Sequence, residues 1–230
     1  MAGLEFRAIF FDLDGTLVDI HGPLYSAARR ALDQLGYQPS LTREVFDNAM
    51  ARNDLWLGLP DNIRASYSKL AFALFLSEND KSERFEVLPH VVETLAELKR
   101  RDYATGVITS RPGNPQRLVE KLAMVGLASY LDHVSTQTTL SLKALDKSES
   151  LKETALRAGV SPQSCMYVGD EPRDIMAATN AGFGARIAVA TGAASYDHLR
   201  GHQQFKPDFV MRSMSELLDL LERLRESGKI

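Results

Sequence analysis

The apolar residues in the first third of the chain change from a strand spacing to a helix spacing. Residues 8–11 are four consecutive apolar residues, which is typical of a short buried strand. Over residues 24–35 apolar positions recur every three or four residues, and Gly36 is a suitable helix end. The same spacing predicts helices over residues 41–51 and 63–76. A block made only of helices therefore interrupts the chain after its first strand.

Strand and helix patterns alternate over the rest of the chain. Helices are expected over residues 89–101, 114–125, 148–158 and 172–181, and from Ser213, where Ser213 and Glu216 have the spacing of a capping box. Strands are expected over residues 103–109, 133–135, 165–168 and 185–190, with an edge strand over 209–211. Alternating strands and helices favour a parallel sheet covered on both faces. The sequence thus predicts an α/β protein with a doubly wound, Rossmann-like parallel sheet and an inserted helical block.

Composition and charge narrow the class of protein. The 230 residues suffice for one sizeable domain or for a core domain with a smaller insertion, and 44% apolar residues are typical of a globular protein. The net charge of −3 predicts no nucleic-acid partner. No apolar run is long enough to span a membrane and residues 1–5 lack a signal-peptide pattern, so we expect no membrane partner. The single cysteine, Cys165, lies in an expected buried strand, which fits the cytoplasm as the expected location.

Three of the expected strands end in polar residues. Asp12 and Asp14 follow the first strand, Thr109 ends the second, and Asp170 follows the strand over residues 165–168. In parallel sheets of this kind, ligands bind beyond the carboxyl ends of the strands. We therefore expect these side chains to meet at one edge of the sheet.

The acidic residues suit several kinds of chemistry. Asp12 and Asp14 are two residues apart, and Gly15 favours a turn that redirects them. Such a pair can supply a nucleophile, a proton carrier and the oxygen ligands that Mg²⁺ prefers. The alternative is a pair of solvated acids at the end of a strand. A helix that begins after Asp170 would bring Asp174 back beside it, and the alternative there is an acidic helix N-terminus.

Hydroxyl and ammonium groups are candidates for phosphate binding. Thr109 and Ser110 precede a loop and a helix, where hydroxyls and free backbone N–H groups can hold a phosphate, although Ser and Thr commonly end strands. Lys143 and Lys147 precede the helix that leads to the strand before Asp170, so one of them could point into the same site. For each lysine, a solvated surface charge is the alternative.

Taken together, these segments resemble the haloacid dehalogenase superfamily of phosphohydrolases. The resemblance covers nearly the whole chain and is carried, in the order of that family, by Asp12-Leu13-Asp14-Gly15-Thr16, Thr109, a lysine, Gly169-Asp170 and Asp174. Residues 167–175 and 207–210 are similar to the phosphoglycolate-phosphatase-like branch. The resemblance implies a core domain formed by residues 1–18 and 86–230, and a helical cap domain formed by residues 19–85.

The resemblance also implies a role for each polar side chain. Asp12 would be the nucleophile and form an aspartyl-phosphate. Mg²⁺ would be the cofactor, held by Asp12, the backbone carbonyl of Asp14, Asp170 and water, with Asp174 close by or binding through water. Asp14 would protonate the leaving alcohol and then activate water. Thr109, the lysine and backbone N–H groups would hold the phosphoryl oxygens. In the dehalogenating and phosphonate-cleaving branches the position of Asp14 is typically not an acid, so its presence favours phosphate esters.

The lysine and the substrate contacts of the cap are less defined. Residues 142–149 depart from the Lys-Pro-x-Pro of many relatives, and Lys147 is favoured over Lys143 because its place directly before the helix fixes its direction. Arg52 could pair with a carboxylate or second phosphate of the substrate, and Trp56 could exclude water from the site. The alternatives are a solvated helix end and a core residue of the cap.

The predicted function is a Mg²⁺-dependent phosphatase that hydrolyses a small phosphorylated metabolite, of phosphoglycolate or sugar-phosphate type, through an aspartyl-phosphate. A phosphomutase on a similar core is an alternative among enzymes. A regulatory module that binds metal or phosphate without catalysis is the alternative outside enzymes. The sequence leaves open the substrate and whether the protein is a monomer or a homodimer.

Overall fold

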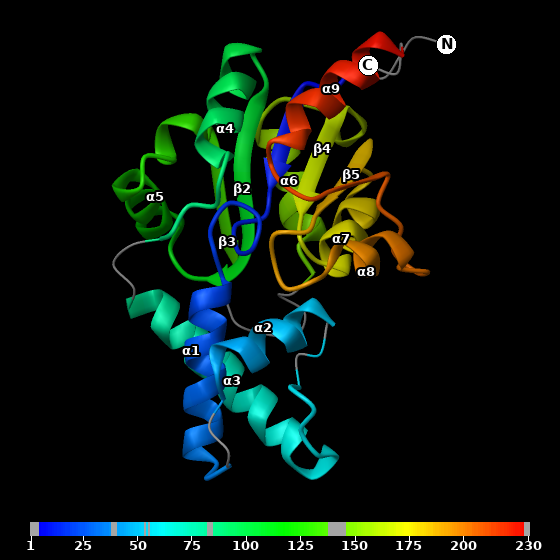
Figure 1. The fold of residues 1–230 in the computed structure, drawn as a ribbon. Coiled ribbons are helices and arrows are strands. Elements are labelled where there is room, and N and C mark those ends of the chain that lie inside the picture. The colour runs from blue at the N-terminus through cyan, green and yellow to red at the C-terminus, as the bar shows by residue number, and fades with distance from the viewer. Residues whose placement is uncertain are drawn as a thin grey trace.

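The computed structural model describes residues 5–37, 41–52, 54, 56–81, 85–137 and 146–227. Its strands form a six-stranded sheet in which all neighbouring pairs are parallel, in the order β3-β2-β1-β4-β5-β6 (Figure 1). The strands are β1 (Ala8–Phe11), β2 (Ala104–Pro112), β3 (His133–Gln137), β4 (Cys165–Gly169), β5 (Ala185–Val189) and β6 (Phe209–Met211). The doubly wound parallel sheet predicted from the sequence is confirmed.

Helices cover both faces of the sheet because successive side chains of a strand point to opposite faces. In β1, Ile9 and Phe11 belong to one apolar cluster, and Ala8 and Phe10 belong to another. The helices of the first cluster are α4 (Val91–Arg100), α5 (Pro115–Met124) and α9 (Glu216–Glu226). Those of the second are α6 (Ser148–Arg157) and α7 (Pro172–Ala181). The uninterrupted apolar run of β1 is therefore explained by burial on both faces.

A separate group of three helices lies beyond the carboxyl edge of the sheet (Figure 1). These helices are α1 (His21–Gln34), α2 (Arg43–Ala51) and α3 (Asp61–Lys81). They share an apolar cluster of their own, in which Ala31, Phe46 and Tyr67 are buried. Within the described part of the chain, neither α3 nor any other helix has the length and apolar character needed to cross a membrane.

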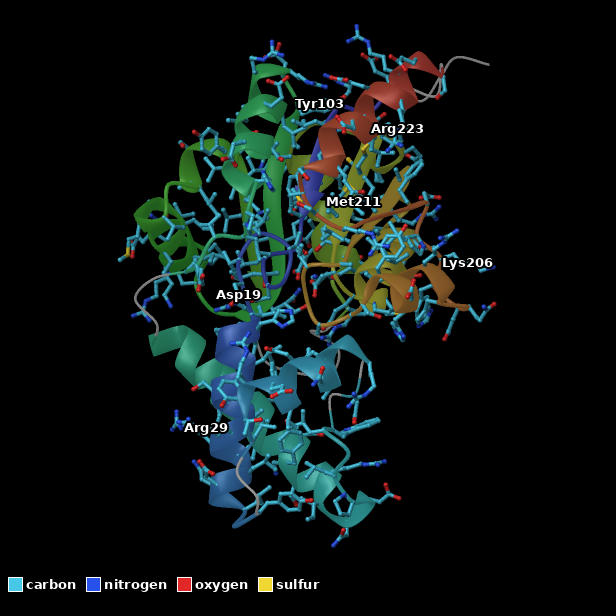
Figure 2. All side chains as sticks on the ribbon, viewed as in Figure 1. Asp19, Arg29, Tyr103, Lys206, Met211 and Arg223 are labelled. Carbon is cyan, nitrogen blue, oxygen red and sulfur yellow. The ribbon has the colours of Figure 1, made fainter. Side chains whose placement is uncertain are left out.

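Two adjacent segments connect these three helices to the sheet. Val18 forms an antiparallel bridge with Val87, and the amide of Asp19 donates to the carbonyl of Glu86 over 2.8 Å. Asp19 lies at the junction between the helices and the sheet, as Figure 2 shows. The chain therefore leaves the sheet and returns to it at one place, close to the end of β1.

Several elements differ from the sequence-based prediction in length or number. The helix α3 continues to Lys81 and β3 to Gln137, beyond the predicted ends at residues 76 and 135. β2 continues to Pro112 instead of ending at residue 109, because Pro112 pairs with Gln137 of β3 after a shift of register. The helix α8 (Tyr196–Gly201) is additional; it is only 6 residues long, too short to give a periodic signal.

The predicted capping box at the start of α9 is wrong. The N-cap is Ser215, and its side chain makes no capping hydrogen bond. Glu216 instead accepts a hydrogen bond from the amide of Arg212 over 3.0 Å. The helix begins two residues later than the Ser213 pattern indicates, because the preceding residues form a turn that leads out of β6.

Candidate active site

The register of the strands brings the polar residues of the motifs together. β1 lies between β2 and β4, and Phe11 pairs with both Val107 and Val168. The residues just beyond these pairs, Asp12 after β1 and Asp170 after β4, therefore lie close together. β2 and β3 lie on one side of β1, and β4, β5 and β6 lie on the other side. The direction in which strands are added therefore reverses at β1, and open α/β sheets bind ligands at such a switch point.

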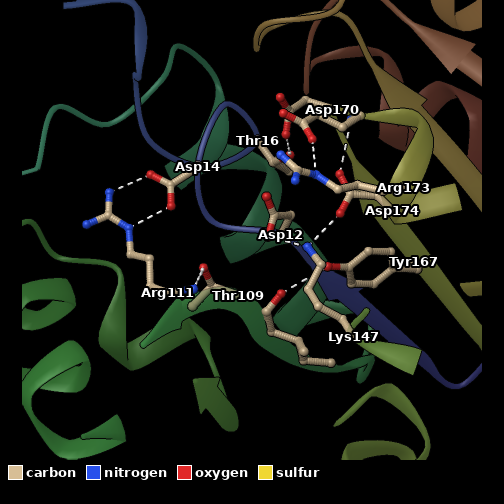
Figure 3. A network of polar contacts seen from close by, with 12 residues as sticks. Asp12, Asp14, Thr16, Thr109, Arg111, Lys147, Tyr167, Asp170, Arg173 and Asp174 are labelled. Atoms are coloured by element: carbon tan, nitrogen blue, oxygen red, sulfur yellow. Dashed lines mark hydrogen bonds and ion pairs between the residues drawn. The ribbon is translucent and has the colours of Figure 1, made fainter. Parts of the chain in front are cut away.

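Three buried carboxylates and one buried ammonium form the centre of this site (Figure 3). Oxygen atoms of Asp12, Asp170 and Asp174 lie within 4.8 Å of one another, and the three residues are 7%, 1% and 2% exposed. Lys147 lies between two of them. Its Nζ donates to Oδ1 of Asp12 over 2.6 Å and lies 2.5 Å from Oδ1 of Asp174.

Asp174 is oriented by the first turn of α7. The amide of Glu171, the N-cap residue, donates to Oδ2 of Asp174 over 3.0 Å as part of a capping box. The other oxygen is thereby directed toward Lys147. A Cβ on Gly169 would lie 2.4 Å from the Cβ of Asp174, so only glycine fits at the end of β4.

Lys147 occupies the N-cap of α6, where Ser, Thr, Asp and Asn are usually preferred. Its side chain makes no capping hydrogen bond and lies beside Tyr167, with Nζ 5.4 Å from the ring centroid. A buried lysine at this position is explained by its contacts with the carboxylates rather than by helix stability. Lys143, the other candidate, lies outside the described residues, so the choice between the two stays a prediction that these contacts support.

Asp170 is enclosed by small residues of two loops. It accepts hydrogen bonds from the hydroxyl of Thr16 over 3.3 Å and from the amide of Ala193 over 3.4 Å. A Cβ on Gly192 would lie 1.8 Å from Oδ2 of Asp170, and a Cβ on Gly15 would lie 2.5 Å from it. Both hydrogen bonds are long for a carboxylate, which suits a group that also binds a cation.

The charges of the centre are unbalanced, since three buried carboxylates lie beside one buried ammonium, which contacts two of them. Burial raises the pKa of Asp12 to about 7, against the attraction of Lys147 and with added repulsion from Asp174. Burial, together with the charge of Glu171, raises the pKa of Asp170 well above its usual range. Burial lowers the pKa of Lys147, but the charges of Asp12 and Asp174 raise it well above its usual range. Buried negative charge of this kind calls for a bound cation.

The donor atoms of the cluster fit a hard divalent cation such as Mg²⁺. All of them are carboxylate oxygens, which suit Mg²⁺, Ca²⁺ or Mn²⁺ better than zinc. A divalent ion would stabilise the ionised forms of these carboxylates, whose charge Lys147 alone does not balance. The cluster omits the side chain of Asp14, in keeping with the expectation that this residue uses its backbone carbonyl.

Asp14 is instead paired with an arginine, to the left of Asp12 in Figure 3. Nε of Arg111 donates to Oδ2 of Asp14 over 2.6 Å, and Nη2 donates to Oδ1 over 2.5 Å. The amide of Arg111 donates to the hydroxyl of the buried Thr109 over 3.1 Å, and Ser110 between them is partly exposed. Arg111 was not expected from the sequence; its position two residues after Thr109, at a strand end, is the signal that could have indicated it.

Arg52 and Trp56, which were expected to contact substrate, are not among the residues that form this carboxylate cluster. Arg52 is the exposed C-cap residue of α2. Trp56 is 49% exposed, its Nε1 donates to the hydroxyl of Ser68 over 3.2 Å, and the guanidinium of Arg64 lies 5.4 Å from its ring. These contacts of Trp56 are with α3, and substrate binding by Arg52 and Trp56 stays a prediction.

Fold and site together define the class of protein: a Rossmann-like enzyme with a buried carboxylate centre at the switch point of its sheet. Residues 9–189 match the family described as haloacid dehalogenase-like hydrolase, and the chain belongs to this family.

Relatives of known name cover nearly the whole chain. The phosphoglycolate phosphatase of Synechococcus elongatus is 30% identical over 223 residues, which are 95% of this chain and 98% of the relative. Pyrophosphatase PpaX of Bacillus cereus is 26% identical over 237 residues, or 97% of this chain and 100% of the relative. A haloacid dehalogenase-like hydrolase structure from Streptococcus pneumoniae has a TM-score of 0.69 at 19% identity and covers 94% of this chain and 98% of its own. The resemblance to the phosphoglycolate-phosphatase-like branch is thus confirmed.

Proposed function

We propose that the chain is a Mg²⁺-dependent phosphatase that hydrolyses a phosphate ester of a small metabolite through an aspartyl-phosphate on Asp12. The observation that carries the proposal is the buried centre of Asp12, Asp170 and Asp174 with Lys147 inserted between two of the carboxylates. The family and the printed names of the relatives support the same class of reaction.

In the first proposed step, Asp12 attacks phosphorus and the bond to the leaving oxygen breaks. Asp14 gives its proton to that oxygen, so the product leaves with a protonated oxygen rather than as an alkoxide. Lys147 and the hydroxyl of Thr109 hold the phosphoryl oxygens as their charge changes. A Mg²⁺ ion held by the carboxylates would neutralise charge on Asp12 and the phosphate.

In the second step, Asp14 takes a proton from a water molecule. The resulting hydroxide attacks phosphorus, the bond between phosphorus and Asp12 breaks, and inorganic phosphate is released. Asp12 is regenerated as a carboxylate, and Asp14 is again protonated for the next turnover.

We also propose that residues 1–18 and 86–230 form the catalytic core domain and that residues 19–85 form the cap domain. The separate apolar cluster of α1, α2 and α3 and the paired connecting segments support this division. His21 of α1 donates from Nε2 to the carbonyl of Gly192 over 3.1 Å. The cap thus contacts the loop that encloses Asp170.

The proposed substrate is a small metabolite phosphate of phosphoglycolate type, because a phosphoglycolate phosphatase is among the relatives. The test is release of inorganic phosphate from 2-phosphoglycolate, sugar phosphates, pyrophosphate and p-nitrophenyl phosphate, with and without Mg²⁺. Mg²⁺-dependent release supports the proposal. Slow turnover that requires a bisphosphate activator would indicate a phosphomutase, and no reaction on any substrate would indicate a binding module.

Asparagine at Asp14 and at Asp170 is expected to cause different defects. Asp14→Asn should bind Mg²⁺ normally, since its side chain is outside the carboxylate cluster, and should turn over at least about 10²-fold more slowly because the proton carrier is lost. Asp170→Asn should raise the half-saturating Mg²⁺ concentration at least about tenfold because a charged ligand is lost. Titration calorimetry and kcat as a function of Mg²⁺ measure both quantities. Equal metal defects in the two variants would contradict this division of roles.

The thermal stability of the protein is expected to depend on Mg²⁺ more strongly at pH 8 than at pH 5. The pKa of Asp12 is about 7 in the folded protein, above its value in an unfolded chain, so stability without metal falls as pH rises through 7. Bound Mg²⁺ offsets this loss, and a hundredfold excess over Kd should raise Tm by roughly 5–10 °C at pH 8.

Differential scanning fluorimetry at the two pH values measures this effect. Asp170→Asn should reduce the Mg²⁺-induced rise in Tm, whereas Asp33→Asn, an exposed position on α1, should not. The same rise at both pH values would show that the buried carboxylates do not bind the metal.

A further inference from the structure

The pair formed by Asp14 and Arg111 has a consequence for substrate selection. We infer that Arg111 binds a second anionic group on the leaving group of the substrate and in doing so releases Asp14 for proton transfer. This inference rests on the proposed function, because it concerns which phosphate esters the same site selects.

The geometry of Arg111 matches an anion with two oxygens. Its Nε and Nη2 already hold the two oxygens of the Asp14 carboxylate at 2.6 and 2.5 Å, which is the two-point contact that a guanidinium makes with a carboxylate or phosphate. A carboxylate or terminal phosphate of the substrate would fit the same fork. Lysine or a single hydroxyl would not provide this contact.

Arg111 lies beside the proposed phosphate-binding site. Its amide donates to the hydroxyl of Thr109, the residue proposed to hold the phosphoryl group. Its guanidinium lies 5.2 Å from the ring centroid of the buried Phe85, and Nζ of Lys121 lies 5.9 Å from the same ring. Arg111 is thus supported by packing that does not involve Asp14.

The paired state also limits what Asp14 can do. Both of its oxygens accept hydrogen bonds from Arg111, so the carboxylate is directed toward Arg111, and its movement to the leaving oxygen competes with this pair. A leaving group that carries its own anion offers Arg111 an alternative partner and thereby frees Asp14 to take up a proton from solvent, which the first proposed step transfers to the leaving oxygen. An uncharged leaving group cannot compete for Arg111, so Asp14 and Arg111 stay paired. Phosphate esters with an acidic leaving group should therefore react faster than esters with an uncharged one.

The selectivity of the wild type and of three variants tests the inference. The measured quantity is the ratio of kcat/KM for 2-phosphoglycolate to that for ethyl phosphate, which has the same two-carbon leaving group without the carboxylate. The wild type should prefer 2-phosphoglycolate, and Arg111→Gln should reduce this ratio at least about tenfold, because charge-assisted hydrogen bonds are lost. Arg111→Lys, which keeps the charge but not the fork, should give an intermediate ratio. Arg117→Gln, at an exposed position of α5, is the matched control and should leave the ratio unchanged.

The outcomes are distinguishable. Pyrophosphate in the same assay shows whether the guanidinium of Arg111 binds a terminal phosphate as well as a carboxylate. A fall in kcat/KM of Arg111→Gln for 2-phosphoglycolate or pyrophosphate that exceeds the fall for ethyl phosphate supports the inference. An unchanged ratio in Arg111→Gln, even if both rates fall equally, would overturn it, since Arg111 would then only position Asp14. No phosphate release by the wild type from any substrate would overturn the proposed function, and this inference with it.

Discussion

Replacement of Asp12 by asparagine is expected to lower phosphatase turnover by at least about 10⁴-fold, because an amide cannot act as the attacking carboxylate. Asparagine has nearly the same size as aspartate, so the contacts around β1 are kept. Substrate-dependent phosphorylation of the protein, detected by its sensitivity to hydroxylamine, should be lost together with turnover. Normal turnover by Asp12→Asn would remove this residue from the role of nucleophile.

Stability measurements separate this loss of chemistry from loss of fold. Asp12 is buried and its pKa is raised to about 7, so its ionised form destabilises the metal-free protein above that pH. Asp12→Asn should therefore have an equal or higher Tm than the wild type at pH 8 without metal. Asp33→Asn, on the exposed face of α1, serves as the control that should change neither property.

Lys147→Ala is expected to lower turnover by about 10²–10³-fold, the scale for loss of one group that stabilises developing negative charge. Nζ of Lys147 lies 2.6 Å from Oδ1 of Asp12 and 2.5 Å from Oδ1 of Asp174, so its removal also leaves two buried carboxylates facing each other. Loss of one partner from a buried ion pair costs about 3–5 kcal/mol of stability. Activity should therefore be assayed in saturating Mg²⁺, at a temperature at which the variant is shown to be folded.

Two further variants make the result specific for Lys147. Lys152→Ala changes a lysine of the same helix whose side chain is 42% exposed, and it should retain activity. Lys143→Ala should also retain activity. If Lys143→Ala is inactive and Lys147→Ala is active, the assignment of the phosphate-binding lysine is wrong.

Much of the fold follows from local patterns in the sequence. The change from strand to helix spacing predicts the helical block, and alternation after residue 87 predicts the parallel sheet. Both are local signals, because they depend on which residues of one short segment are apolar. The short helix α8 and the extension of β2 to Pro112 are not predicted, because α8 has too few residues for a period and β2 depends on pairing with β3.

The positions of acids and hydroxyls directly after three strands can be seen in the amino-acid sequence, since turn residues and apolar runs mark the strand ends. Which of these side chains contact one another depends on the folded arrangement of the strands. The contact between Thr16 and Asp170 joins positions 154 residues apart, and it depends on β1 and β4 being neighbours in register. The pairing of Asp14 with Arg111 likewise depends on β1 lying beside β2. Side-chain partners across strands are set by register and by the space available, and neither is encoded in the local pattern of one segment.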